Sequence, residues 1–185
     1  VAVTQLGSPD EPELSITVTG TRLAYETKST VTGALELLLG IKTDLTEFYR
    51  FAIHDTRLRP LTQRFRGFKP PRFLALFEAL VNGISCQQMT LTFGIRLLNR
   101  LATTYGVALQ IQGEVVHAFP RPEDLAGLEP EALRELGFSR QKSLALIELA
   151  SNITDKHFEL EKLEAMNDED ALASLCELRG GGRWG

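Results

Sequence analysis

The sequence lacks the features that mark membrane, metal-cluster and disulfide-rich secreted proteins. No apolar run approaches the roughly 20 residues that cross a bilayer, and no signal-peptide pattern is visible. The only cysteines, Cys86 and Cys176, form no CxxC pair, which excludes zinc ribbons and four-cysteine iron–sulfur clusters. A disulfide between them stays open, although two reduced thiols are favoured. With 43% hydrophobic and 24% charged residues, the composition predicts an intracellular globular protein.

Acidic residues are missing from one stretch, which runs from Thr56 to Phe77, although the whole chain has a net charge of -4 at pH 7. That net charge argues against binding nucleic acid by bulk electrostatics, but backbone amides can still bind a few phosphates. The stretch is either a solvated surface segment or a phosphate-facing patch. Its basic residues are Arg57, Arg59, Arg64, Arg66, Lys69 and Arg72.

Period-2 hydrophobic alternation is clear near the start of the chain, and the mixed residues 107–118 fit a short extended excursion. Apolar and polar residues alternate from Leu14 to Val18, which predicts a half-buried strand, and Leu23 and Tyr25 suggest a second strand. Two strands alone are marginally stable in water, and the first residue is Val1 rather than Met. We therefore expect residues 1–32 to be the end of a longer N-terminal β domain.

Beyond Gly33 the apolar spacing is helical, which predicts a mainly α domain over residues 33–185. Asp44 is a plausible N-cap, Pro70 is expected to open a helix, and Gly106 is expected to stop one in the left-handed conformation. The other predicted caps are Ser139 and Asp168. The residues expected to face the core are Phe73, Phe77, Leu80, Ile84, Leu91, Ile95 and Leu98.

The most informative residues are the last ones, from Leu178 to Trp184. Gly180 and Gly182 suit a tight turn between helices, where φ is positive and the backbone approaches another surface closely. Consecutive N–H groups at the start of a following helix would form an anion site for DNA phosphates. On its own, a glycine-rich end also fits a disordered tail.

Leu178, Gly180, Gly182, Arg183 and Trp184 resemble the hairpin of the helix-hairpin-helix DNA glycosylases, in particular the DNA-3-methyladenine glycosylase II family. The resemblance implies a mainly α helix-hairpin-helix glycosylase domain, incomplete at its C-terminus, behind a remnant of an N-terminal β domain. Further segments that resemble the family's motifs follow one another in the family's order, namely residues 77–90, 119–125 and 136–139 with Lys142.

This resemblance implies a monofunctional DNA glycosylase that excises alkylated bases, 3-methyladenine and 7-methylguanine, in base-excision repair. Trp184 would line the pocket for the extruded base, because a cationic purine is attracted to a π face; the alternative is a packing aromatic. Bifunctional relatives carry a lysine at this position for a Schiff base, which tryptophan cannot form. The expected partner is double-stranded DNA with alkylated bases, bound by a monomer in the cytoplasm, at a bacterial nucleoid.

The resemblance also assigns DNA-binding residues, with Gln88 as a wedge that fills the gap left by the flipped nucleotide. The alternative is that Gln87 and Gln88 are amides at helix ends. The DNA-binding set is Gln87, Gln88, Gly180, Gly181, Gly182 and Arg183. The backbone carbonyls of Cys176, Leu178 and Gly181 correspond to the family's structural site for a monovalent cation. No cofactor is expected to be required.

Two residues depart from the family's hairpin. Gly181 replaces an apolar residue, usually isoleucine, that anchors the hairpin in the core, and Gly185 replaces a threonine. In the family the catalytic aspartate follows the tryptophan, so we expect it beyond Gly185, no catalytic residue in this chain, and no activity from the chain alone. Two alternatives remain, a non-enzymatic helix-hairpin-helix DNA-binding module and a helical protein-interaction domain with a glycine tail.

Overall fold

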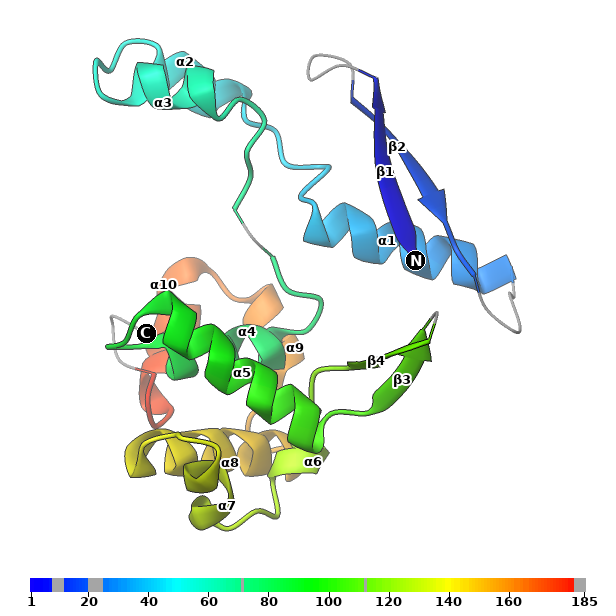
Figure 1. The fold of residues 1–185 in the computed structure, drawn as a ribbon. Coiled ribbons are helices and arrows are strands. Elements are labelled where there is room, and N and C mark those ends of the chain that lie inside the picture. Colours follow the sequence, from blue (N-terminus) through cyan, green and yellow to red (C-terminus); the bar gives the residue numbers. More distant parts are fainter. Residues whose placement is uncertain (8–11, 20–24, 71, 112, 182–185) are drawn as a thin grey trace. The chain divides into compact units, whose positions relative to one another are not determined.

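The computed structural model of the chain describes residues 1–7, 12–19, 25–70, 72–111 and 113–181 (Figure 1). Contacts group the chain into two compact units, Val1–Leu74 and Ala75–Gly185. We predicted domains over residues 1–32 and 33–185. A contact unit is not the same thing as a domain, so those limits stay a prediction.

The first unit begins with a β-hairpin. Strand β1 (Ala2–Gly7) pairs in antiparallel register with β2 (Pro12–Thr17), and helix α1 (Tyr25–Leu38) follows. The strand predicted from Leu14 is therefore present as the second arm of the hairpin. Of the second strand predicted at Leu23 and Tyr25, Leu23 lies outside the described residues. The prediction is wrong at Tyr25, which is the first residue of α1; two apolar residues two positions apart are too short a pattern to distinguish a strand from a helix.

Two short helices, α2 (Thr46–Ala52) and α3 (Leu58–Arg64), complete this unit. The Asp44 carboxylate accepts the backbone N–H of Thr46 at 2.9 Å, although the N-cap position itself is Leu45. Helix α3 lies inside the basic stretch and was not predicted. It begins where the Asp55 carboxylate accepts backbone N–H groups from the first turn, as a cap does.

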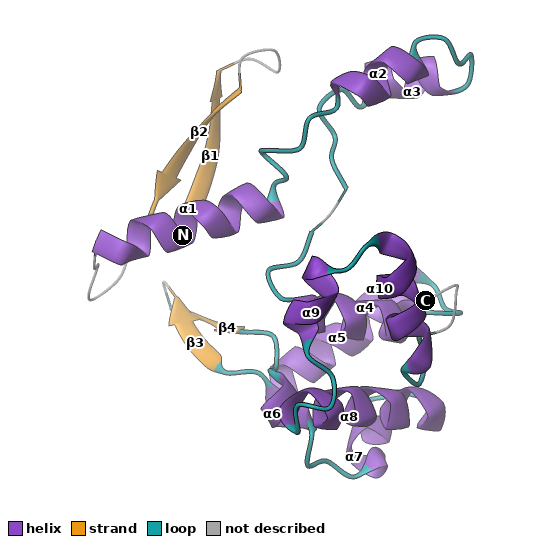
Figure 2. Cartoon of the chain, turned by 180° about the vertical axis from the view of Figure 1, so that it is seen from behind, coloured by secondary structure: helices purple, strands orange, loops and turns teal. Residues whose placement is uncertain are grey.

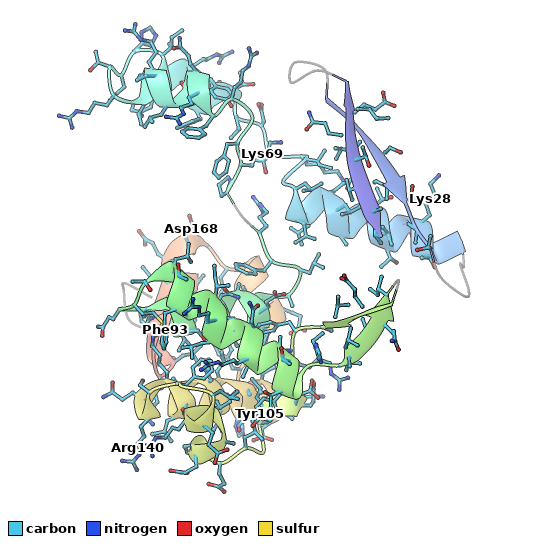
Figure 3. All side chains as sticks on the ribbon, in the orientation of Figure 1. Lys28, Lys69, Phe93, Tyr105, Arg140 and Asp168 are labelled. Atoms are coloured by element: carbon cyan, nitrogen blue, oxygen red, sulfur yellow. The ribbon has the colours of Figure 1, made fainter. Side chains whose placement is uncertain are left out.

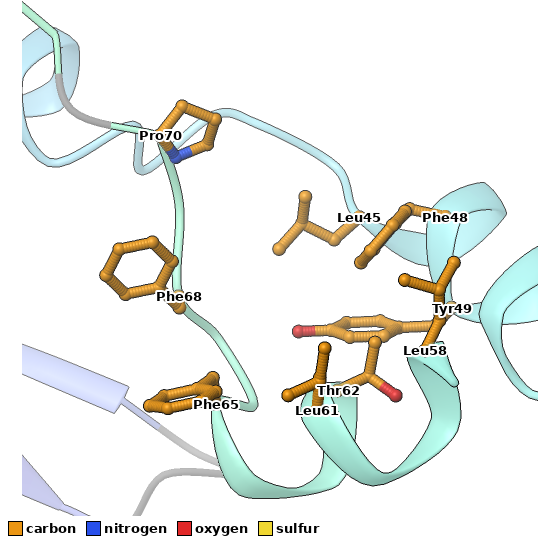
Figure 4. A pocket seen from close by; sticks show the side chains of 9 residues that line it. All are labelled: Leu45, Phe48, Tyr49, Leu58, Leu61, Thr62, Phe65, Phe68 and Pro70. Atoms are coloured by element: carbon orange, nitrogen blue, oxygen red, sulfur yellow. The ribbon is translucent and has the colours of Figure 1, made fainter. Parts of the chain in front are cut away.

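An apolar pocket of about 650 Å³ lies between α2 and α3 (Figure 4). The rings of Phe65 and Phe68 meet edge to face with centroids 6.5 Å apart, and the Arg64 guanidinium lies 5.3 Å from the Phe65 centroid. Lys69 donates to the carbonyl oxygens of Gly40 and Ile41, at 2.7 and 3.2 Å. Two basic residues of the stretch, Arg64 and Lys69, therefore make local packing and capping contacts. The lining residues are Leu45, Phe48, Tyr49, Leu58, Leu61, Thr62, Phe65, Phe68 and Pro70.

The second unit is a helical assembly in which α8 packs against α4, α6 and α7, with a small hairpin, β3–β4, between α5 and α6 (Figure 2). The mainly α fold predicted for this part of the chain is confirmed. Its elements are α4 (Leu76–Cys86), α5 (Leu91–Tyr105), β3 (Ala108–Ile111), β4 (Glu114–His117), α6 (Pro122–Leu125), α7 (Pro130–Glu135), α8 (Arg140–Thr154), α9 (Leu160–Ala165) and α10 (Asp168–Glu177).

The residues buried in this unit differ in part from those predicted to face the core. Leu91 and Ile95 are 70% and 46% exposed, because α5 turns a neighbouring face inward. Phe73 precedes α4 and is also exposed, since that helix begins at Leu76 rather than at Pro70. The buried cluster is Phe77, Val81, Ile84, Leu97, Leu98, Leu101, Leu125, Leu133, Phe138, Ala145, Leu146, Leu149 and Ala150.

The helix ends follow the predicted signals in part. Ser139 caps α8 by accepting the backbone N–H of Lys142, as predicted. Asn167, rather than Asp168, caps α10, and Asp168 is the first residue of that helix (Figure 3). Gly106 has φ of -80° and not the predicted left-handed conformation. Glycine is needed there because a Cβ would lie 1.9 Å from the Ala118 carbonyl oxygen.

Candidate nucleic-acid interface

The turn between α4 and α5 carries the two predicted glutamines. Gln87 is extended after the last residue of α4, and Gln88 follows with φ of 52°. A left-handed residue other than glycine costs about 1–2 kcal/mol, so contacts around the turn must hold it there. Thr90 then caps α5 by accepting the backbone N–H of Phe93. The turn is therefore a defined and locally strained structure.

A glycine turn follows α10. Gly180 has φ of 84°, which confirms the predicted left-handed glycine, and the N–H of Gly181 donates to the Leu178 carbonyl at 2.9 Å. A Cβ on Gly181 would lie 1.9 Å from the Leu175 carbonyl oxygen. With this backbone no larger side chain fits at position 181.

The two turns meet in space although 93 residues separate them. The Gln87 side-chain amide donates through Nε2 to the Gly180 carbonyl oxygen at 2.9 Å. From α8, Lys142 Nζ donates to the carbonyl oxygens of Ser85 and Gln87, at 2.8 and 2.7 Å. The structure thus brings the predicted glutamine turn and the predicted hairpin to one place.

A groove of about 460 Å³ lies where these elements meet. Burial lowers the pKa of the Lys142 ammonium group, and the nearby Cys86 opposes that shift. Arg179, at the rim, pairs with Glu148 of α8 at 3.3 Å. No carboxylate lines the groove within the described part of the chain. The lining residues are Ile84, Gln87, Gln88, Ser139, Gln141, Lys142, Leu144, Ala145, Arg179 and Gly180.

A smaller pocket of about 190 Å³ adjoins the hairpin. It is mostly apolar, and Leu172, Leu175, Leu178 and Gly181 are among the residues that line it. The pocket thus leaves apolar space between the end of α10 and the glycine turn.

Of the predicted DNA-binding residues, the groove unites Gln87, Gln88 and Gly180, and Gly181 lies next to it. Gly182, Arg183 and the predicted base-pocket residue Trp184 lie outside the described residues. The role of Lys142 was missed. Its position three residues after a serine N-cap was visible, but its contacts with α4 depend on how α4 and α8 pack.

The predicted cation site involves the carbonyls of Cys176, Leu178 and Gly181. The Leu178 carbonyl already accepts the Gly181 N–H, and a carbonyl oxygen has a second lone pair with which it can bind a cation. The donor set is therefore compatible with a cation, and the site stays a prediction. In the described residues no cluster of His, Cys, Asp or Glu could hold a metal, and the thiols of Cys86 and Cys176 are free.

Comparisons with known proteins identify the family. Residues 81–181 match the family described as HhH-GPD superfamily base excision DNA repair protein. The chain belongs to this superfamily. It is 32% identical over 144 residues to a DNA-3-methyladenine glycosylase of Bacillus subtilis, covering 78% of this chain and 48% of that protein. It is 31% identical over 118 residues to DNA-3-methyladenine glycosylase 2 of Escherichia coli, covering 64% and 41%.

Solved structures confirm the helix-hairpin-helix glycosylase fold. A 3-methyladenine DNA-glycosylase from Archaeoglobus fulgidus aligns with a TM-score of 0.75 at 28% identity, over 94% of this chain and 56% of that one. An 8-oxoguanine glycosylase/lyase from Clostridium acetobutylicum, in complex with double-stranded DNA, aligns with a TM-score of 0.77 at 17% identity, over 96% and 58%. The chain spans about half the length of these relatives. Within the described residues no helix is both long and apolar enough to cross a membrane.

Proposed function

We propose that this chain is the DNA-gripping part of a monofunctional DNA glycosylase that excises alkylated bases, 3-methyladenine and 7-methylguanine, in base-excision repair. The observation that carries the proposal is the contact of Gln87 with Gly180. This contact places the turn that carries Gln88, whose side chain can enter the duplex, beside a backbone turn that can bind phosphate. The named relatives support alkylated bases as the substrate class.

In the proposed mode of DNA binding, the glycine turn binds phosphate and the α4–α5 turn fills the gap in the duplex. Small residues at Gly180 and Gly181 let the backbone approach a phosphate closely, and backbone amides bind it without a net positive charge. Gln88 lies on the opposite turn and enters the gap of the flipped nucleotide, whose unstacking costs a few kcal/mol. This division fits a chain with net charge of -4, because few phosphates need to be neutralised.

The reaction type follows from Trp184, which supplies a π face for a cationic base but no amine. Water would then be the nucleophile, and a carboxylate would stabilise the positively charged sugar in the transition state. We propose that this carboxylate is the family aspartate expected beyond Gly185. The backbone carbonyls of Cys176, Leu178 and Gly181 would hold a monovalent cation, which would supply positive charge near a DNA phosphate, and no redox cofactor is required.

One observation favours a second candidate, a DNA-binding module without catalysis. No carboxylate lines the groove in the part of the chain that is described. Such a module would use the same two turns to hold DNA, and it would release no base.

Base release tests the proposal directly. The whole protein is incubated with a methylated duplex, and free 3-methyladenine and 7-methylguanine are quantified beside borohydride trapping of any covalent adduct. We expect base release by the whole protein without an adduct, and none by the 185-residue chain alone. Binding without release would favour the DNA-binding module, and an adduct formed as fast as the base is released would contradict the monofunctional reaction.

A further inference from the structure

Lys142 has no part in the proposed chemistry, yet it contacts the turn that carries Gln88. From the first turn of α8, its ammonium group donates to the carbonyl oxygens of Ser85 and Gln87. These carbonyls lie at the end of α4, where the last carbonyl groups lack partners within the helix and the helix dipole is negative. The Lys142 ammonium group, which belongs to α8, therefore caps the C-terminal end of α4.

The turn beyond that end is held on two sides. Gln88 follows at φ of 52°, a conformation that a residue other than glycine keeps only where its surroundings enforce it. On the hairpin side, the Gln87 side-chain amide donates to the Gly180 carbonyl oxygen. On the α8 side, the Lys142 ammonium group donates to the Gln87 carbonyl oxygen. Lys142 is half-buried, and its pKa is lowered by burial, so the group is held among protein atoms and not freely solvated.

We propose that Lys142 is a positioning residue that fixes the α4–α5 turn in the conformation that presents Gln88 to DNA. This inference rests on the proposed function, since it requires Gln88 to fill the gap of the flipped nucleotide. A side chain without a hydrogen-bond donor at position 142, such as methionine, would leave the carbonyls of Ser85 and Gln87 without this donor. The turn would then relax toward commoner backbone angles at Gln88, and the amide would move away from the gap.

The alternatives give different binding patterns. A lysine that binds phosphate would support affinity for every duplex alike, whereas one that positions Gln88 supports affinity for a duplex with a gap. The decisive quantity is therefore a ratio: the affinity of the whole protein for a duplex with an abasic-site analogue, divided by its affinity for the same duplex undamaged. A general loss of affinity does not change this ratio.

The test titrates the whole protein with both duplexes at one salt concentration. We expect Lys142→Met to lower the ratio about tenfold, which corresponds to roughly 1.4 kcal/mol, and to change binding of the undamaged duplex about twofold or less. The matched control is Lys162→Met. Lys162 is exposed on α9 and pairs with Glu159, so this variant removes the same charge without touching the turn, and its ratio should equal that of the wild type.

A double variant separates a positioning role from a general structural one. If Lys142 acts through Gln88, adding Lys142→Met to Gln88→Ala lowers the ratio no further. If Lys142→Met lowers the ratio further in the Gln88→Ala variant, the inference is overturned. It is also overturned if Lys142→Met alone weakens binding of both duplexes equally. If Lys142→Met shows no cooperative thermal transition, Lys142→Gln replaces it, and a smaller decrease of the ratio is expected, because the amide can still donate to the carbonyls.

The two claims fail in different ways. If Gln88→Ala leaves the ratio at the wild-type value, the wedge is wrong, and both the proposed DNA grip and the role of Lys142 fall with it. If Gln88→Ala lowers the ratio and Lys142→Met does not, the proposed function stands and only the positioning role of Lys142 is refuted.

Discussion

Gly180→Ala should destabilise the protein because the hairpin needs a left-handed residue there. The φ of 84° costs an alanine about 1–2 kcal/mol. The added Cβ would also lie 3.2 Å from the Cβ of Ala145 and 3.5 Å from Cγ1 of Ile84, so neighbouring atoms must shift slightly. For a chain of this size, that loss lowers the midpoint of thermal unfolding by roughly 2–8 °C.

Thermal unfolding followed by circular dichroism measures this loss, and Gly127→Ala is the matched control. Gly127 lies in the same unit, its φ is not left-handed, and a Cβ there meets no atom within 4 Å. The control should unfold at the wild-type temperature or slightly above it, because alanine restricts the unfolded chain. Equal midpoints for the two variants would refute the left-handed hairpin turn and the geometry built on it.

Two further predictions concern the fold. Leu97→Ala should cost about 2–5 kcal/mol and Ile95→Ala about 0.5 kcal/mol or less, measured by urea unfolding, because only Leu97 is fully buried; similar losses would contradict the orientation of α5. Asp124→Asn should cost about 0.3–1 kcal/mol near neutral pH, since the carboxylate accepts the Arg121 N–H at the start of α6. The side-chain hydrogen bond of Arg121 lowers the pKa of Asp124 below 3.8, so its contribution is present above that pH and is lost as pH falls through the folded value. A difference between wild type and variant that grows on acidification would contradict this.

The sequence predicted the helical unit well because its signals are local. The Ser139 cap, for example, was predicted from a single residue and is present in the structure. The face of α5 that points inward was predicted partly wrongly, because the exposed Leu91 and Ile95 fit the same helical period as the residues that are buried. Apolar spacing gives the period of a helix, but the partner that packs against it decides which stripe is covered.

The candidate site was predictable only as far as motif resemblance reached. Gln87, Gln88 and Gly180 were named from the sequence, and the structure brings them together. The contact of Lys142 with the end of α4 was not predictable, because nothing in the sequence fixes which carbonyls a lysine on α8 will meet. Long-range contacts of this kind depend on tertiary packing.

The most direct test of the account compares two glutamines by the affinity ratio for abasic-analogue over undamaged duplex. Gln88→Ala should lower this ratio severalfold, since a filler for the gap is lost while backbone contacts to phosphate remain. Gln110→Ala, on an exposed position of β3, should leave the ratio at the wild-type value. If Gln88→Ala weakens binding of the two duplexes equally, Gln88 is only an amide at a helix end and the central claim is wrong.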